Sequence, residues 1–202
     1  MARDLLGKIL IHESDEGVTS GRIVEVEAYH GAIDKASHAY KNLRTCRTEV
    51  QFGSAGFTYI YLIYGMHYCF NVVTDEIDIP GAVLVRALEP VEGLELMRSR
   101  RGLKNLSSRS VVELCNGPGK LCSAMGITKE LYGCDLVNSP LYIVEDDLSQ
   151  DRFEVATTPR IGVDYDREGG ELLWRFIISN SPFISMKKFS KEYLDSSFDK
   201  VH

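Results

Sequence analysis

The sequence predicts a mixed α/β (α+β) fold built as a single domain. Short runs rich in β-branched and aromatic residues recur along the chain, and they alternate with segments that carry helix-ending signals. The 202 residues can bury one sizeable core, and no repeat, low-complexity tract or linker divides them. We therefore expect one domain over residues 1–202, with a core to about residue 188 and a polar tail over 189–202.

The overall composition is that of an ordinary soluble globular protein, with 44% hydrophobic and 26% charged residues. No run is long enough for a membrane span, and the first residues lack the layout of a signal peptide. The five cysteines are odd in number and form no CxxC pair, so we expect reduced thiols in a cytoplasmic protein without a membrane partner.

The net charge of −6 argues, taken alone, against a nucleic-acid partner. The basic residues are clustered, however, over residues 35–47, 98–109 and 187–191. Each cluster is a solvated surface by default, but local positive faces on an acidic protein remain compatible with this pattern.

Two strands are expected near the amino terminus, over residues 8–12 and 22–29, after a short helix that ends at Gly7. In the second strand Glu25, Glu27 and Tyr29 share one face. This face is either exposed to solvent or lines a cleft. Loops with one short helical turn are expected over residues 30–56.

A hairpin is predicted from Phe57 to Val73, with its turn at residues 64–67. Tyr64 and Met66 occupy a tip where small polar residues are usual. Asn71 is the only side chain of the return strand that demands hydrogen bonds. The pattern fits core packing with an unusual turn, or a wedge that enters stacked bases beside a base-binding pocket.

A buried strand is expected from Gly81 to Leu88, and it contains Arg86. Burial of an unpaired guanidinium is costly, so Arg86 needs a carboxylate partner, for which Glu27 is a candidate. A helix is expected to open at Pro90 and to close at Gly102, with Val91, Leu94 and Met97 as its apolar stripe.

Residues 103–110 are expected to form a connector, followed by a short helix that starts near residues 116–120 and ends before Gly126. Free amides at that helix start, with Lys120 close by, suit a phosphate, although the P-loop pattern is absent. Further strands are expected over residues 141–144, 160–163 and 173–179, followed by a turn over 181–185.

Six segments, in this order, resemble the alkyladenine DNA glycosylase family, also called the methylpurine or 3-methyladenine DNA glycosylases. They are RIVEVEAYHG (22–31), SHAY (37–40), YIYLIYGMHYCFNV (59–72), VLVRALEPVEG (83–93), CNGPGKLC (115–122) and SPFIS (181–185). The similarity covers about residues 5–185, and the compact length resembles the bacterial branch. It implies a curved antiparallel β-sheet with a protruding hairpin and no helix-hairpin-helix element.

The resemblance also assigns catalytic roles. Glu27 matches the family's general base, while Arg86 and the main-chain carbonyl of Ile184 match the groups that hold the attacking water. A carboxylate suits this chemistry because it takes a proton from water and stabilises an oxocarbenium-like sugar. We expect Arg86 to keep Glu27 ionised. No lysine matches the nucleophile position, so we expect hydrolysis without strand nicking.

The family pattern places further residues in the pocket and on the DNA. Tyr29, His38 and Tyr61 match the aromatic residues that sandwich an extruded base, and Asn71 matches a residue that rejects the amino group of guanine. Tyr64 matches the residue that fills the gap in the duplex, with Met66 beside it; Lys120, Arg98 and Arg101 are expected to contact phosphates.

The resemblance implies a monofunctional, monomeric DNA glycosylase of base excision repair that acts in the cytoplasm at the nucleoid. Its partner is double-stranded DNA that contains damaged purines, namely 3-methyladenine, 7-methylguanine or hypoxanthine, with ethenoadenine as a further candidate. The base is flipped out and the N-glycosidic bond is hydrolysed to leave an abasic site. No cofactor and no metal are expected, since no zinc-binding spacing is present.

Several alternatives stay open at the level of sequence. The Glu27–Arg86 pair could be purely structural, and His38 could be a satisfied loop histidine. The chain could be a non-catalytic module that binds damaged DNA, or an unrelated hydrolase that uses His30 and His38. Departures from the family pattern at Ala32, Cys46, Gln51, Ser54, Ala55 and Asn180 affect the loops and not the proposed catalytic residues.

Overall fold

The computed structural model describes residues 1–146, 153–163 and 170–185. These residues form a curled antiparallel sheet whose strands follow the order β3-β4-β5-β2-β1-β6, with β8 pairing both β2 and β7. The strands are β1 (Ile9–Ser14), β2 (Gly17–His30), β3 (Thr58–Ile63), β4 (His67–Thr74), β5 (Gly81–Glu92), β6 (Leu141–Val144), β7 (Val155–Thr158) and β8 (Arg175–Ile178). The predicted mixed fold around a curved antiparallel sheet is confirmed.

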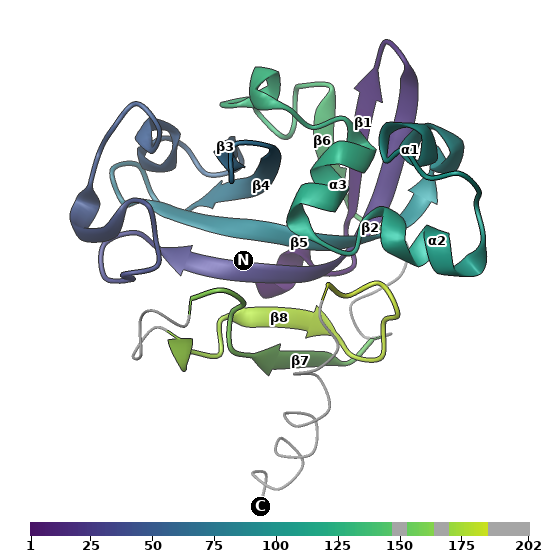
Figure 1. Ribbon diagram of the computed structural model, residues 1–202. Coiled ribbons are helices and arrows are strands. Elements are labelled where there is room, and N and C mark those ends of the chain that lie inside the picture. The colour runs from purple at the N-terminus through teal and green to yellow at the C-terminus, as the bar shows by residue number, and fades with distance from the viewer. Residues whose placement is uncertain (147–152, 164–169, 186–202) are drawn as a thin grey trace, which may run out of the picture.

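Three α-helices lie on one side of the long strands β2 and β5, as Figure 1 shows. They are α1 (Leu94–Arg100), α2 (Ser108–Leu114) and α3 (Pro118–Met125). Met97, Leu114 and Leu121, one from each helix, are fully buried in the main core with Ile23 and Leu88 of the sheet. Short 3₁₀ turns at Arg3–Leu5, Tyr40–Asn42, Glu49–Phe52 and Lys129–Leu131 complete the regular elements.

Strand β2 is the centre of the sheet. Along one edge it pairs with β5, and it also pairs with β1 through its first part and with β8 through Glu25–Glu27. Its alternation sends Val24 and Val26 into the apolar core. The register against β5 shifts on either side of Glu25, which marks a β-bulge at that residue.

The predicted hairpin is confirmed as β3 and β4, with Ile63 opposite His67. Tyr64 and Gly65 of its turn have φ values of 53° and 69°. Positive φ at two successive turn residues matches the right-handed twist of the flanking strands. Tyr64 therefore has a left-handed backbone conformation, which is uncommon for a bulky residue, and its side chain is exposed at the tip of the hairpin.

The predicted helix start at Pro90 is wrong. Strand β5 continues to Glu92, and Pro90 lies opposite Gly21, where the pairing register shifts. Helix α1 begins only after Gly93, whose φ is 76° and where a Cβ would lie 2.3 Å from the carbonyl oxygen of Val18. Val91 is consequently an exposed strand residue and not part of a helical stripe.

Two further elements differ from the prediction. The strand expected over residues 160–163 is wrong, because β7 spans Val155–Thr158 and Arg160 leaves the sheet to pair with Asp34. The connector expected over residues 103–110 already contains the start of α2. Ser107 caps that helix in a reciprocal capping box with Ser110, and this signal is readable in the sequence.

Residues 30–56 contain two 3₁₀ turns, Tyr40–Asn42 and Glu49–Phe52, where one helical turn was expected, while the other predicted segments agree with the structure in place and type. The strands near residues 8–12, 22–29, 81–88, 141–144 and 173–179 and the helix that ends before Gly126 are all present. All five cysteines are free, and three of them are buried. The predicted core boundary near residue 188 and the polar tail lie outside the described residues. Within the described ranges no helix is long and apolar enough to cross a bilayer.

Candidate active site

Glu27 is a fully buried carboxylate with a complete set of hydrogen-bond donors. Its exposed fraction is 0%. Arg86 Nη1 donates to Oε2 at 3.0 Å, and the Tyr29 hydroxyl donates to the same oxygen at 2.9 Å. The backbone N–H of Ile161 donates to Oε1 at 2.7 Å. The contact predicted between Glu27 and Arg86 is present, and the solvent-face interpretation of Glu25 and Glu27 is wrong.

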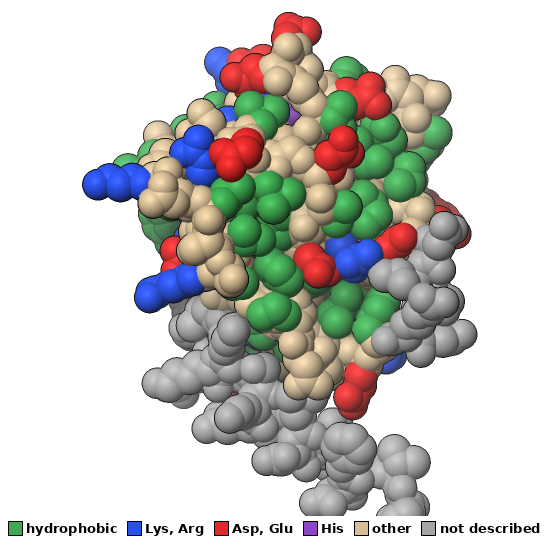
Figure 2. Space-filling model, turned by 90° about the vertical axis from the view of Figure 1, so that its right-hand side faces the viewer, with side chains coloured by type: hydrophobic (Ala, Val, Ile, Leu, Met, Phe, Trp, Pro, Cys, Tyr) green, Lys and Arg blue, Asp and Glu red, His purple; other side chains and the backbone are tan. Residues whose placement is uncertain are grey.

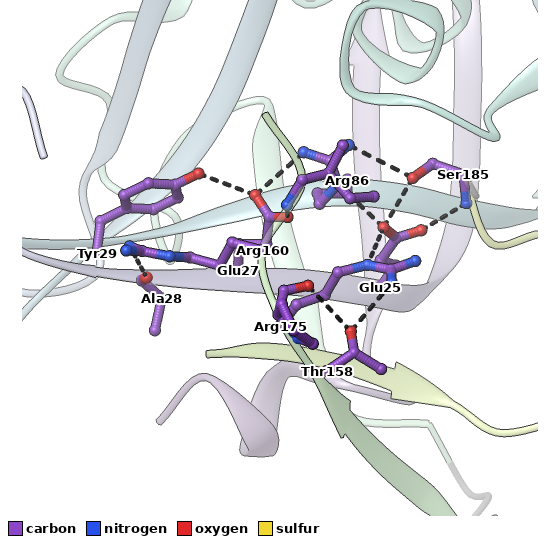
Figure 3. A network of polar contacts seen from close by, with 11 residues as sticks. Glu25, Glu27, Ala28, Tyr29, Arg86, Thr158, Arg160, Arg175 and Ser185 are labelled. Carbon is purple, nitrogen blue, oxygen red and sulfur yellow. Dashed lines mark hydrogen bonds and ion pairs between the residues drawn. The ribbon is translucent and has the colours of Figure 1, made fainter. Parts of the chain in front are cut away.

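Glu25 lies near Glu27 on the same strand (Figure 3), and its exposed fraction is also 0%. Its Oε1 accepts from Arg86 Nε at 2.9 Å and from Arg175 Nε at 2.8 Å. The backbone N–H and the hydroxyl of Ser185 donate to the same carboxylate. Burial opposes the charge, but Arg86 and Arg175 outweigh it and lower the pKa of Glu25.

Arg86 bridges the two glutamates and is itself almost fully buried. Burial works against its charge, but Glu27 and Glu25 raise the pKa of Arg86. Pairing with the two carboxylates therefore offsets the free-energy cost of burying the Arg86 charge.

A cavity of about 290 Å³ opens next to this network. Tyr29, Arg86 and Ile161, the three residues that bind Glu27, all contribute to its wall. The other predicted pocket residues, His38, Tyr61 and Asn71, line the same cavity. The structure thus brings together the predicted pocket residues and the predicted catalytic arginine around one hollow, with Glu27 directly behind it.

Three aromatic rings of this cavity, those of His38, Tyr59 and Tyr61, lie close to one another. The rings of His38 and Tyr61 are 4.7 Å apart between centroids and nearly perpendicular. Tyr59, which the sequence did not assign to the pocket, lies 5.4 Å from Tyr61. Burial, and next to it the charge of Glu27, raises the pKa of Tyr29, so its hydroxyl stays a donor to the carboxylate.

The tautomer of His38 follows from its neighbours. Its Nε2 lies 3.2 Å from Arg47, whose guanidinium can only donate. Nε2 is therefore the acceptor, and Nδ1 carries the proton that faces the Tyr59 hydroxyl at 2.7 Å. Partial burial of the ring, followed by the charge of Arg47, lowers the pKa of His38 to about 4.

A second buried ion pair supports the wall of the cavity. Arg160 pairs with Asp34, and both side chains are fully buried. The Arg160 guanidinium lies 4.6 Å from the ring centre of Tyr29 and 5.1 Å from that of Trp174. Tyr29 is thus fixed at its hydroxyl by Glu27 and at its ring by Arg160.

Asn71 is buried at the back of the cavity. Its amide nitrogen donates to the backbone carbonyl of Tyr59 at 2.9 Å across the β3–β4 pair, which fixes the orientation of the amide. Ile184 is also buried, and it packs against Ala156 and Ile177. It directly precedes Ser185, so the predicted carbonyl belongs to the turn that Glu25 holds.

The predicted DNA-contacting residues fall into two groups. Tyr64 and Met66 are 83% and 70% exposed at the hairpin tip. Lys120 is exposed near the start of α3, where Gly119 lies against the His67 side chain of β4. Lys120 is therefore close to the hairpin.

Arg98 and Arg101 are less available than Lys120. Arg98 donates to Glu95 at 2.6 Å and to the carbonyl of Leu103 at 2.7 Å. Arg101 is half-buried near the end of α1. No described contact connects either residue to the hairpin or to the cavity.

The main residues that the sequence analysis missed are Glu25, Arg175, Tyr59, Arg47 and Arg160. Two of them carried a readable signal. Arg175 stands alone in an apolar strand, as Arg86 does, and the same need for a carboxylate partner applied to it. Tyr59 alternates with Tyr61 on one face of a strand. Arg47 and Arg160 lie outside regular elements, where alternation gives no information about direction.

The chain is similar to known proteins over most of its length. The family model described as methylpurine-DNA glycosylase (MPG) matches residues 1–182. A Desulfitobacterium hafniense protein named "Putative 3-methyladenine DNA glycosylase" is 49% identical over 190 residues, which cover 93% of each chain. Proteins of the same name from Alkaliphilus oremlandii and Clostridium acetobutylicum are each 47% identical, with 92–93% of the chains covered. The chain belongs to the methylpurine-DNA glycosylase family.

Proposed function

We propose that this protein excises damaged purines from double-stranded DNA by a monofunctional hydrolytic mechanism. The observation that carries the proposal is the position of Glu27, a buried carboxylate bound by Arg86 behind an aromatic cavity. Family membership supports the class of reaction, the cleavage of an N-glycosidic bond in DNA. The substrates we propose are 3-methyladenine, 7-methylguanine and hypoxanthine, with ethenoadenine as a further candidate.

Access to the bond requires the nucleotide to leave the duplex, because a stacked base cannot reach a cavity inside a protein. The tip of the hairpin supports such a step. Tyr64 offers an aromatic face on a rigid two-stranded support, and in this proposal it takes the place of the extruded base, with Met66 beside it. The purine then enters between Tyr29 on one side and His38 and Tyr61 on the other.

Selection of the base follows from the shape and polarity of the cavity. Aromatic walls attract any purine, and an electron-poor alkylated purine most strongly. Asn71, fixed by its bond to Tyr59, contributes a polar group at a defined position. We propose that it disfavours the exocyclic amino group of normal guanine.

The chemical step places a water between Glu27, Arg86 and the carbonyl of Ile184. As the sugar–purine bond lengthens, positive charge develops on the sugar, and the Glu27 carboxylate stabilises it. The same carboxylate accepts the proton of the attacking water. The products are a free purine and an abasic site.

Strand cleavage is not part of the proposed reaction. A glycosylase that also acts as a lyase needs an amine nucleophile to form a Schiff base. No lysine is among the described residues that line the cavity. The abasic strand should therefore stay intact until it is treated with alkali.

Replacement of Glu27 by Gln tests the proposal. We expect Glu27→Gln to lower the single-turnover rate of hypoxanthine release by at least about 100-fold, because the amide cannot accept the proton of water. Binding to the same lesion duplex should persist. The measurement is release of free base and formation of alkali-labile sites from a duplex with one hypoxanthine.

The matched control is Glu89→Gln, which removes a glutamate charge on β5 whose partner is the partly exposed Arg22. This variant should keep the wild-type rate. A Glu27→Gln enzyme that releases base at the wild-type rate would remove the general-base assignment. A wild-type protein that binds lesion DNA without releasing base would favour a binding module instead.

A further inference from the structure

Arg86 is held by two carboxylates, and the proposed reaction uses only one of them. Its Nη1 donates to Glu27 at 3.0 Å, whereas its Nε donates to Glu25 at 2.9 Å. Nη2 lies 3.5 Å from the hydroxyl of Ser185. Because an arginine side chain has several rotatable bonds, a contact at Nε sets the plane in which the terminal nitrogens lie.

We propose that Glu25 is a positioning residue: it holds Arg86 and the Ile184–Ser185 turn in one arrangement around Glu27 without touching the substrate. This inference rests on the proposed function, because it assigns Arg86 and the carbonyl of Ile184 to the attacking water. Glu25 is 0% exposed and does not line the cavity, so neither its accessibility nor the cavity lining identifies it as part of the site. Its contacts with Arg86 and Ser185 do.

The contacts of Glu25 come from three segments that are distant in sequence. Arg86 belongs to β5, Arg175 to β8 and Ser185 to the turn that follows β8. A single carboxylate therefore ties together the two groups that are expected to hold the water, and Figure 3 shows Ser185 and Arg86 on the same carboxylate. Loss of this anchor frees both groups at once.

Glu25 has a second cationic partner, Arg175, so its negative charge is not neutralised by Arg86 alone. Arg175 is fully buried and donates to Glu25 at 2.8 Å and to Thr158 at 3.0 Å. The network thus contains two carboxylates and two guanidinium groups. Glu25 is balanced by Arg175, which leaves the charge of Arg86 to balance Glu27.

Removal of the Glu25 charge weakens the hold on Arg86. With glutamine at position 25, one negative charge of the network is lost and both arginines remain. The contact at Nε of Arg86 then changes from a charge-assisted hydrogen bond to a weaker one with a neutral amide, while the contact of Nη1 with Glu27 is kept.

The experiment measures single-turnover hypoxanthine release by Glu25→Gln, together with affinity for the lesion duplex and the melting temperature. We expect the rate to fall on the order of 10- to 100-fold, the size that follows from a displacement of about 1 Å at a reacting group. Affinity for the lesion duplex should be unchanged, because Glu25 does not touch the substrate. A role limited to folding would lower affinity together with the rate.

Thr158→Val is the matched control, because it removes a polar contact in the same buried network on the far side of Arg175. It should lower the melting temperature and leave the rate and the affinity for the lesion duplex unchanged. If it loses as much rate as Glu25→Gln, the effect belongs to general loosening of the fold and the inference is overturned.

Should Glu25→Gln fail to fold, Ser185→Ala carries the test. This variant removes only the hydroxyl that donates to Glu25 at 2.7 Å, at a half-buried position. A reduced rate at an unchanged melting temperature supports the inference, and a wild-type rate overturns it.

The failure of this inference can be told apart from failure of the proposed function. A Glu25→Gln enzyme with the full rate of base release, beside an inactive Glu27→Gln enzyme, overturns the positioning role alone. Absence of base release from the wild-type protein overturns the proposed function and the inference together.

Discussion

His38 is the clearest example of a side chain whose chemistry is set by its contacts. The Arg47 guanidinium donates to Nε2, so Nε2 is the unprotonated nitrogen, and the Tyr59 hydroxyl lies within hydrogen-bond distance of Nδ1. The neutral imidazole therefore presents a flat and uncharged surface beside Tyr61 over the whole physiological range of pH. A charged imidazolium would repel a cationic methylated purine, the kind of substrate that we propose above.

We predict that His38 titrates near pH 4 and not near 6.5, because partial burial and Arg47 disfavour its charged form. The unfolded chain takes up this proton near pH 6.5, so the free energy of unfolding should fall as pH decreases from about 6.5 toward 4. NMR titration of the imidazole resonances measures the midpoint directly. His38→Gln should remove this part of the pH dependence, and a midpoint near 6.5 would contradict the assignment.

At the residue level the sequence predicted the contact between Glu27 and Arg86, because a lone charge in an apolar strand requires a partner. It did not predict that Glu25 shares Arg86, because alternation places both glutamates on one face and does not show which contacts each makes. Those contacts depend on the β-bulge at Glu25 and on the long-range pairing of β2 with β5 and β8. The tautomer of His38 could not be predicted either, because it depends on the contact with Arg47, and the direction of a loop side chain does not follow from the sequence pattern.

Among the elements, the β3–β4 hairpin combines a rigid base with an exposed aromatic tip. Its strands pair without interruption from Thr58–Val72 to Ile63–His67, and β4 continues the sheet into β5. The side chains at its tip make no contribution to the core clusters among the described residues. Folding alone therefore does not explain why Tyr64 and Met66 occupy this turn.

We predict that Tyr64→Ala leaves the melting temperature unchanged but lowers affinity for lesion DNA by about 10- to 100-fold. Loss of one aromatic–base stack is worth about 1–3 kcal/mol. Fluorescence anisotropy with a hypoxanthine duplex measures the affinity, and thermal unfolding measures stability. Ile77→Ala, at a 67% exposed position in the loop between β4 and β5, is the control and should bind normally. Equal affinity in the two variants would exclude the wedge.

The elements themselves were largely predictable, and the errors have physical causes. Proline fits the first turn of a helix, but it also fits a strand position where the pairing register shifts, as at Pro90. The apolar run at residues 160–163 has strand-like composition, yet the pairing of Arg160 with Asp34 takes that segment out of the sheet. In both cases tertiary contacts overrode a local preference.

Over the whole molecule, acidic residues outnumber basic ones, and the net charge is −6. The face in Figure 2, seen from the right of Figure 1, carries acidic side chains scattered among hydrophobic ones and no continuous basic stripe. The β3–β4 hairpin lies at the opposite end of the sheet order from β1 and β6, and Lys120 belongs to α3, which packs against β4. Few phosphate contacts are therefore expected.

We predict a shallow salt dependence for DNA binding, with a slope of log K against log salt of about −3 or weaker, since each phosphate contact contributes about −0.9. Lys120→Ala should reduce the slope by about one. Lys8→Ala, which removes a lysine paired with Glu145 at the far end of the sheet, is the control. An unchanged slope in Lys120→Ala would remove Lys120 from the interface.

Strand β2 carries Glu25, Glu27 and Tyr29 and is at the same time paired with three other strands. Because neighbouring side chains along a strand point to opposite faces, deletion or insertion of a single residue would exchange the glutamate-bearing face and the apolar face throughout the rest of the strand. Substitution of one amino acid for another within β2 is therefore compatible with this arrangement, whereas a change in its length is not. We expect differences in length among related proteins to be confined to the loops, which form part of the cavity wall.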